Sequence, residues 1–445
     1  MKKILIISEH FAPENSIGAL RMTKVAKYLS RANYKITVLT AEKSLDVADD
    51  LALNGLENVE IKRVPILRDS FAKKITDIIR KQPVYKRTIK STVAQANADF
   101  YEPTKTQLLI KDFHDFVFFM INYQKDKRFA KNAKKYIKKE MGKYDVVISS
   151  YGPESCHMIG RYCKKYMKCK WIADFRDHTY SSMTPRLAVP ICKINYWKVK
   201  KGADLMTGTA EFTFWNMDTY DFSKIAIISN GYDRQDKQIR DRINEKFTLC
   251  YTGNLYYKKS NLNFVFRAIA ELIAEGKIES DRISVVYAGN CFDRFMLQAK
   301  ENGIDYLVTD YGFCSRKESL QLQANSDILL LAVWNSENEE GILTGKVYEY
   351  IMNEKPIACS VVGKKGDSQI KKMINEMSLG ICCEEYYGES DYIILKQQLA
   401  KWYAEFVEKS EVQYGGNRQM CGQFSYEELI KKWIAVIEQV LNNAN

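Results

Sequence analysis

The segment with the clearest chemical pattern is GILTGKVYEYIMNEKP, residues 341–356. Thr344 can begin a helix as its N-cap, and Gly345 lets the backbone approach a ligand closely. A helix that begins there presents unpaired N–H groups to a phosphate or diphosphate. Glu349 follows Gly345 by four residues on the same helical face, so its carboxylate could accept hydrogen bonds from both hydroxyls of a ribose. The pattern therefore predicts a site for a diphosphate that is carried on a ribose.

This segment also has a superficial similarity to the P-loop of ATPases. Three residues separate Gly341 from Gly345, whereas a P-loop has four, and Val347 stands where the P-loop requires Ser or Thr. These differences disfavour an ATPase of the P-loop class.

Further candidate residues follow the first apolar run of the chain, KILIIS at residues 3–8. Gly18 permits close approach of the backbone to a ligand, and Arg21 lies near the start of the helix that follows. Asn15 and Ser16 are suitable N-caps, so a purely structural loop is an alternative interpretation of this segment.

Two later apolar runs, DVVISS and KWIADF, are also followed by polar residues. His157 comes after the first run, and DFRDH, residues 174–178, closes the second. Chemistry in an open parallel sheet is expected at such carboxyl strand ends. Asp174 or Asp177 could orient an acceptor hydroxyl, although one of them could instead pair with Arg176.

In their order and spacing, these motifs resemble family 4 glycosyltransferases of the GT-B fold, particularly bacterial enzymes that build surface polysaccharides. The similarity extends over nearly the full length. KVYEY at 346–350 resembles the K-x-x-E-Y pattern of the donor-binding helix, and NGYD at 230–233 resembles the NG-x-D signature before the interdomain linker. YTGNLY at 251–256 resembles the first strand and loop of the donor domain. One departure is that Gly341 occupies the place of the first Glu of the family's E-x7-E motif, while Glu339 and Glu340 are out of register.

The resemblance implies a retaining sugar transfer, in which the donor diphosphate leaves while the acceptor hydroxyl attacks the same face of the sugar. It implies no cofactor and no essential metal, and the sequence contains no D-x-D motif of the GT-A class. Lys258 or Lys259 stands where a basic residue meets the diphosphate, and Phe313 and Cys314 match the loop that recognises the nucleobase. The implied roles are catalytic for His157 and Asp177, acceptor-binding for Arg21, Asp174 and Arg176, and donor-binding for Gly18, Gly253, Lys259, Phe313, Thr344, Gly345, Lys346 and Glu349.

The elements that must position these residues are short apolar runs, each followed by a longer helical stretch. This alternation is typical of parallel βαβ units, and it restarts after the polar stretch 233–246. The sequence therefore predicts an α/β protein with two doubly wound, Rossmann-like domains facing across a cleft that holds the ligands. We expect an acceptor-side domain at 1–235, a nucleotide-sugar-binding domain at 246–405, and a helix within 425–445 that returns to the first domain.

A basic helical insertion is expected at about 66–141 of the first domain. Residues 61–145 contain 21 Lys and Arg against 9 Asp and Glu. This excess of 12 positive charges equals the net charge of +12 of the whole chain. Residues 126–141 show apolar side chains on one helical face and lysines on the other, typical of a helix packed on a sheet with a solvated basic face. The sharper hypothesis is contact with an anionic membrane. The lysines concerned are Lys127, Lys131, Lys134, Lys135 and Lys138.

Composition excludes several other classes of protein. The 445 residues are 46% hydrophobic with only 8 prolines, which excludes a mainly disordered chain. The eleven scattered cysteines lack zinc or redox spacing, and the four histidines are too far apart to form a local metal motif. No run of apolar residues is long enough for a signal peptide or a membrane span. We expect a cytoplasmic protein that can bind peripherally at the inner face of the cell membrane.

The expected partners are a nucleotide-sugar donor and a glycan or lipid-linked acceptor, with an anionic membrane surface as a further partner and no nucleic acid. Two alternatives stay open. One is a nucleotide-sugar epimerase of the same fold. The other is a non-catalytic protein whose basic segment binds a membrane or RNA.

Overall fold

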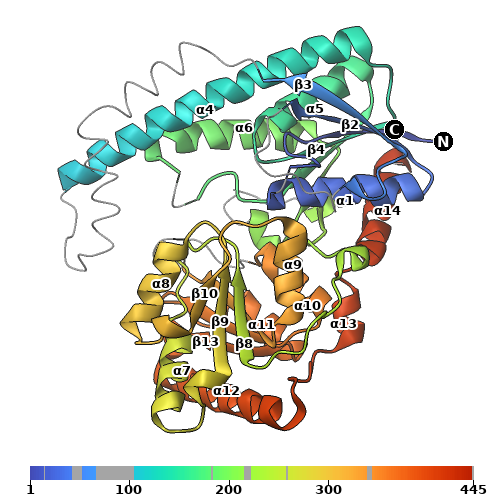
Figure 1. Cartoon of the computed structure of the whole chain (residues 1–445). Coiled ribbons are helices and arrows are strands. Elements are labelled where there is room, and N and C mark those ends of the chain that lie inside the picture. Colours follow the sequence, from blue (N-terminus) through green and yellow to red (C-terminus); the bar gives the residue numbers. More distant parts are fainter. Residues whose placement is uncertain are drawn as a thin grey trace.

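The computed structural model describes residues 1–14, 16–42, 53–66, 105–181, 184–214, 222–256, 259–337 and 343–442. Within them, two parallel β-sheets are each covered by helices on both faces (Figure 1). The first sheet has the strand order β3-β2-β1-β4-β5-β6-β7. Its strands are β1 (Lys3–Ile7), β2 (Lys35–Glu42), β3 (Val59–Pro65), β4 (Val146–Ser150), β5 (Lys170–Phe175), β6 (Leu205–Gly208) and β7 (Ile225–Ile227).

The second sheet has the order β10-β9-β8-β11-β12-β13. The strand order reverses between β8 and β11, and in open α/β sheets ligands bind outside the carboxyl ends of the strands at such a point. Its strands are β8 (Phe247–Thr252), β9 (Ile283–Ala288), β10 (Val308–Asp310), β11 (Ile328–Trp334), β12 (Ile357–Val362) and β13 (Gly380–Glu384). The predicted fold class, two doubly wound α/β domains, is confirmed.

Strand β13 was missed by the sequence analysis. Its sequence, GICCE, contains two adjacent cysteines and ends in a glutamate, so it lacks the β-branched run by which the other strands were recognised. Glu384 is nevertheless fully buried, and it accepts hydrogen bonds from the backbone and hydroxyl of Ser368. Ser368 is the N-cap of the helix that precedes β13 in the chain. The strand therefore ends in a buried, hydrogen-bonded carboxylate, which a search for apolar runs does not predict.

Helices from distant parts of the chain cover the two faces of the first sheet. On one face, α1 (Ile17–Arg31) packs beside α14 (Tyr426–Asn442), and Trp433 and Ile437 of α14 share a core with Ile4 and Ile6 of β1. The last helix of the chain therefore lies on the first domain (Figure 1). The opposite face is covered by α4 (Lys105–Glu140), α5 (Ser155–Met167) and α6 (Val189–Gly202).

Helix α4 contains the end of the expected basic insertion, while residues 67–104 of that insertion lie outside the described residues. Phe129, Ala133 and Ile137 of α4 are buried against the sheet, whereas Lys131 and Lys138 are exposed. The amphipathic pattern predicted for this stretch is therefore present, in a helix that begins 21 residues before Asp126.

The second sheet is flanked by helices of the second half of the chain. They are α7 (Asn263–Ala274), α8 (Phe292–Glu301), α9 (Arg316–Asn325), α10 (Gly345–Asn353), α11 (Gln369–Glu376), α12 (Glu389–Lys409) and the short α13 (Arg418–Gly422). Helix α10 packs against α9 at the edge that faces the first domain, so it is placed to contact a ligand between the domains.

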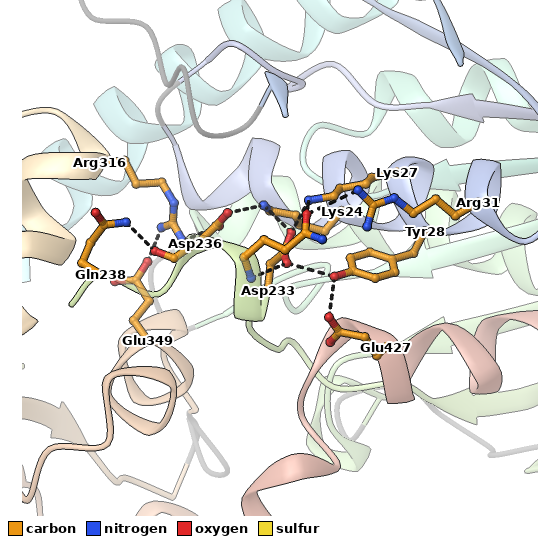
Figure 2. Close-up of polar contacts among 11 residues, drawn as sticks. Lys24, Lys27, Tyr28, Arg31, Asp233, Asp236, Gln238, Arg316, Glu349 and Glu427 are labelled. Carbon is orange, nitrogen blue, oxygen red and sulfur yellow. Dashed lines mark hydrogen bonds and ion pairs between the residues drawn. The ribbon is translucent and has the colours of Figure 1, made fainter. Parts of the chain in front are cut away.

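The segment between the two sheets is anchored to α1 by buried charges (Figure 2). The carboxylate of Asp233 accepts hydrogen bonds from Lys24 Nζ at 2.7 Å, Lys27 Nζ at 2.6 Å and the Tyr28 hydroxyl at 2.9 Å. Both lysines are only 1% exposed. Burial would raise the pKa of Asp233, but the charges and hydrogen bonds of the two lysines outweigh it and hold that pKa well below its usual range.

We predict that Asp233→Asn destabilises the protein by about 3 kcal/mol at pH 7, because the buried Lys27 loses its carboxylate and the buried Lys24 loses one of its two. Since the pKa of Asp233 is lowered by folding, its stabilisation is present above the ordinary Asp pKa of about 3.9 and declines as the pH falls below it. Denaturant unfolding at pH 7 and at pH 3 should therefore show a smaller difference between variant and wild type at pH 3. A difference that does not change with pH would contradict this assignment.

Candidate active site between the two domains

A cavity of about 480 Å³ lies between the domains at the carboxyl ends of β8 and β9. Its walls come from both domains, with Ser16, Leu20 and Arg21 on one side and residues of the second sheet and its helices on the other. The predicted site residues that line it are Arg21, Gly253, Phe313, Gly345, Lys346 and Glu349. The cavity thus brings together six residues that are up to 328 positions apart in the sequence.

Gly253 and Lys346 form one wall of this cavity. Gly253 has a φ of +106°, a backbone conformation that favours glycine, and a Cβ at this position would lie 2.8 Å from the Lys346 side chain. The Lys346 ammonium lies 5.2 Å from the centre of the Tyr251 ring. Burial lowers the pKa of Lys346, with Glu349 acting in the opposite direction. A desolvated ammonium beside a helix N-terminus is a suitable partner for an anionic group.

The Glu349 carboxylate is held by two side chains of α9. Arg316 Nη1 donates to Oε1, and Gln323 Nε2 donates to Oε2 at 3.2 Å. Gln323 is itself fully buried. Its amide also donates to Thr252 Oγ1 at 2.9 Å and accepts from Asn353 Nδ2 at 2.9 Å, so its polar atoms are satisfied inside the protein. The orientation of Glu349 is therefore fixed by residues on a neighbouring helix.

Sequence reasoning missed both Arg316 and Gln323. The only available signal was a helical one, because Ser315 and Glu318 form a capping box that begins α9, and Arg316 and Gln323 are seven residues apart on one face. Nothing in that spacing shows that the face is turned toward α10.

Phe313 lies at the outer edge of the cavity and is 53% exposed. The preceding Gly312 has a φ of +64°, and its carbonyl accepts a hydrogen bond of 2.8 Å from the backbone of Gly289, another cavity residue. An exposed aromatic ring on a loop fixed in this way is able to stack on a planar ligand group.

Arg21 and Asp174, two predicted acceptor contacts, form a buried ion pair at 2.9 Å. Asp174 is fully buried and also accepts from the hydroxyls of Ser150 and Thr207, at 3.1 and 2.8 Å. Arg21 donates in addition to the carbonyls of Ile228 and Ser229. In this structure the pair joins β5 to the segment that leads into the NGYD motif, and Asp174 faces protein groups rather than the cavity.

Arg176 ties together three loops at the carboxyl ends of the first sheet. Its guanidinium donates to the carbonyls of Gly18, Gly152 and Tyr151, the last two at 2.6 and 2.8 Å. A Cβ on Gly18 would lie 2.8 Å from Arg176 Nη1. The space beside Gly18 is therefore occupied by this guanidinium, which explains the glycine without a ligand.

His157 lies beneath the surface among the rings of Tyr151, Trp171 and Phe175. Its Nδ1 is 2.8 Å from Ser149 Oγ, which accepts a hydrogen bond from the indole of Trp171 at 2.8 Å. The Ser149 hydroxyl can donate its own hydrogen to Nδ1, and in that tautomer the imidazole hydrogen is on Nε2. Burial lowers the pKa of His157 to about 3, so the ring is neutral near pH 7.

Three further predicted residues, Thr344, Lys259 and Asp177, do not line the cavity. Thr344 precedes α10 as its N-cap residue but makes no side-chain capping bond, and its Oγ1 is buried without a hydrogen-bond partner among the described residues. The Lys259 ammonium lies 5.0 Å from the centre of the Trp334 ring. Asp177 is exposed beyond the end of β5.

Solved structures with the same architecture contain related pairs of domains. Anabaena HepE, in a complex with UDP and glucose, is 12% identical with a TM-score of 0.59, and the match covers 99% of this chain and 100% of HepE. The chain has the GT-B fold. Sucrose-phosphate synthase from Thermosynechococcus elongatus is 10% identical with a TM-score of 0.61, over the whole of both chains.

A putative UDP-N-acetylglucosamine 2-epimerase from Listeria monocytogenes is also similar, with 10% identity and a TM-score of 0.54 over 100% of this chain and 97% of the epimerase. No protein-family model matches the sequence, and no curated protein matches it. The expected similarity to family 4 is thus supported at the level of the GT-B fold.

We predict that the imidazole of His157 does not titrate between pH 5 and pH 8, because burial keeps it neutral over that range. Its ring ¹⁵N and ¹H resonances, assigned by comparison with a His157→Gln variant, should stay constant during an NMR pH titration. Movement of these resonances with a midpoint near 6.5 would show that the ring is accessible to solvent protons.

Proposed function

We propose that this protein is a glycosyltransferase that moves a sugar from a nucleotide-sugar donor to a glycan or lipid-linked acceptor. The observation that carries the proposal is the convergence of Lys346, Glu349 and Phe313 on one interdomain cavity at the topological switch point of the second sheet. Each side chain suits a different part of a nucleotide. The Lys346 ammonium suits the diphosphate, the Glu349 carboxylate suits the ribose hydroxyls, and the Phe313 ring suits the base.

On the donor side, the diphosphate would lie at the N-terminus of α10 beside Lys346, where N–H groups and an ammonium offset its charge. Departure of the nucleoside diphosphate then requires fixed positive groups more than a strong base. We propose that these protein groups provide that stabilisation without an essential metal and that transfer retains the configuration of the sugar. Structures of HepE with UDP and with UDP-glucose favour a uridine nucleotide as the first donor to test.

On the acceptor side, we propose a second interdomain cavity of about 820 Å³ as the acceptor site. Tyr348 of α10 lines it together with Thr209 and Ser229 of the first domain. Ser229 is held by Arg21, and the Thr209 hydroxyl donates to the Arg176 carbonyl. Arg21 and Arg176 would therefore act on the acceptor by positioning this wall, and Asp174 by fixing Arg21.

The catalytic roles predicted for His157 and Asp177 stay predictions. A neutral, buried His157 would act as a hydrogen-bond donor through Nε2 rather than as a base, since its pKa lies far below 7. Asp174 is paired with Arg21, whereas Asp177 is exposed just beyond the end of β5 and takes no part in that pair.

The test of the donor site is transfer by Glu349→Ala. We expect at least a tenfold loss of transfer to acceptor at low donor concentration, because a hydrogen-bonding group for the ribose is removed. A screen of UDP- and GDP-sugars with mass-spectrometric detection of products provides the assay. Glu354→Gln at the end of the same helix, where Glu354 pairs with Arg418 at 3.1 Å, is the matched control.

Unchanged transfer by Glu349→Ala would remove this site assignment. A product that stays nucleotide-linked and forms without any acceptor would identify an epimerase, the alternative that the similarity to the Listeria structure keeps open.

We also propose that the first domain contacts the anionic surface at the inner face of the cell membrane. The five lysines predicted for this role line a single groove of about 350 Å³ with Met158 and Tyr162 of α5. Helix α6, which helps to cover the same face of the sheet, carries four lysines and exposes Ile194 and Trp197, each 53% exposed. Among the described residues, no helix is both long and apolar enough to cross a bilayer.

We predict that replacing Lys131, Lys134 and Lys138 with Gln abolishes most binding to liposomes that contain phosphatidylglycerol, because each lysine near an anionic surface contributes about 1 kcal/mol. Flotation measures binding, and transfer to a soluble acceptor should survive. The control replaces Lys409, Lys431 and Lys432, which removes the same charge elsewhere on the surface. Retained liposome binding, or steeply salt-dependent RNA binding lost in the same variant, would contradict the membrane assignment.

A further inference from the structure

The proposed donor site is connected to the first domain by a continuous series of charged side chains (Figure 2). Arg316 donates from Nη1 to Glu349 and from Nη2 to Asp236 Oδ2 at 3.3 Å. The other oxygen of Asp236 accepts from Lys24 Nζ at 2.7 Å. Lys24 is on α1, Asp236 is in the interdomain segment, and Arg316 is on α9, so the series crosses from one domain to the other.

Each member of this series is largely withdrawn from solvent. The side chains of Lys24 and Asp236 are 1% and 3% exposed, and that of Arg316 is 12% exposed. Ion pairs at this depth are little screened by salt, and removal of one member leaves a buried charge without its partner. The position of Arg316 is therefore set from both ends, by the first domain through Asp236 and by Glu349.

The hydrogen bonds of Glu349 leave it able to bind a ligand. Arg316 uses Oε1 and Gln323 uses Oε2, one bond each. A carboxylate offers about four acceptor positions, so about two remain, and both Glu349 and Arg316 line the cavity. A vicinal diol, which has two hydroxyl donors, fits this remaining capacity.

We propose that Arg316 is a positioning residue for the donor: held by Asp236 and Lys24, it orients Glu349 so that the carboxylate recognises the two ribose hydroxyls. The inference rests on the proposed function, which supplies the nucleotide. Under this arrangement, recognition of the ribose depends on the placement of the first domain, although Glu349 itself belongs to the second.

The test compares the affinities of UDP and 2′,3′-dideoxy-UDP by calorimetry on the full chain, with GDP and its dideoxy analogue where the donor screen selects guanosine. Wild type should bind the diol-containing nucleotide at least tenfold more tightly. Arg316→Gln should reduce that ratio to about threefold or less, because a misoriented carboxylate loses the hydroxyls and leaves base and phosphate contacts intact. Arg316→Lys should restore part of the ratio, and Asp236→Asn should lower it in the same direction.

The control is Arg418→Gln, which breaks an exposed pair with Glu354 in the same domain. General destabilisation would weaken both nucleotides equally and leave the ratio unchanged, and thermal melts of each variant check that it folds. A wild-type ratio preserved in Arg316→Gln overturns the inference, as does tighter binding of UDP by that variant, which would make Arg316 a competitor for Glu349. If wild type binds no nucleoside diphosphate, the proposed function fails and the inference fails with it.

Discussion

Asp233 lies between two lysines that the surrounding protein has almost completely removed from water, and this contact fixes the start of the interdomain segment on α1. An ammonium in such a position requires a carboxylate partner, since an unpaired buried charge is strongly destabilising. The tight backbone around it contributes as well: a Cβ on Gly231 would lie 2.2 Å from the Phe424 carbonyl, just before α14. The NGYD motif therefore joins α1, the interdomain segment and the last helix at one point.

The arrangement of the proposed donor site follows from that junction. Asp236, three residues after Asp233, also binds Lys24, and through Arg316 it reaches the carboxylate that we assign to the ribose. On the other side of the junction, Arg21 connects the first sheet to Ile228 and Ser229. Arg21, Arg316 and Glu349 take part in these contacts and also line the cavity of the proposed donor site, so part of their hydrogen-bonding capacity is used by protein groups.

The fold was largely predictable because most of the buried parallel strands are continuous apolar runs, as in KILIIS, DVVISS and KWIADF. The donor residues of α10 were predictable because Gly345, Lys346 and Glu349 are close in sequence. By contrast, the partners of Glu349 are 26 and 33 residues away, and only the packing of α9 on α10 brings them together. Arg176 and Gly18 show the same limit: the sequence indicated the glycine, but the guanidinium that fills its place comes from a strand end 158 residues away.

The basic charge of the first domain differs from the charges at the junction in how it is used. Lys24 and Lys27 are paired with carboxylates inside the protein. The groove lysines have other lysines as their neighbours on the helix, three or four residues apart along α4, as with Lys131 and Lys135. Like charges at this spacing destabilise a helix by about 0.2–0.5 kcal/mol per pair. Burying Phe129 and Ile137 on the sheet contributes about 1.5–3 kcal/mol each and offsets that repulsion. The helix therefore tolerates a charge that does not serve its own folding, which leaves this charge available to an anionic partner.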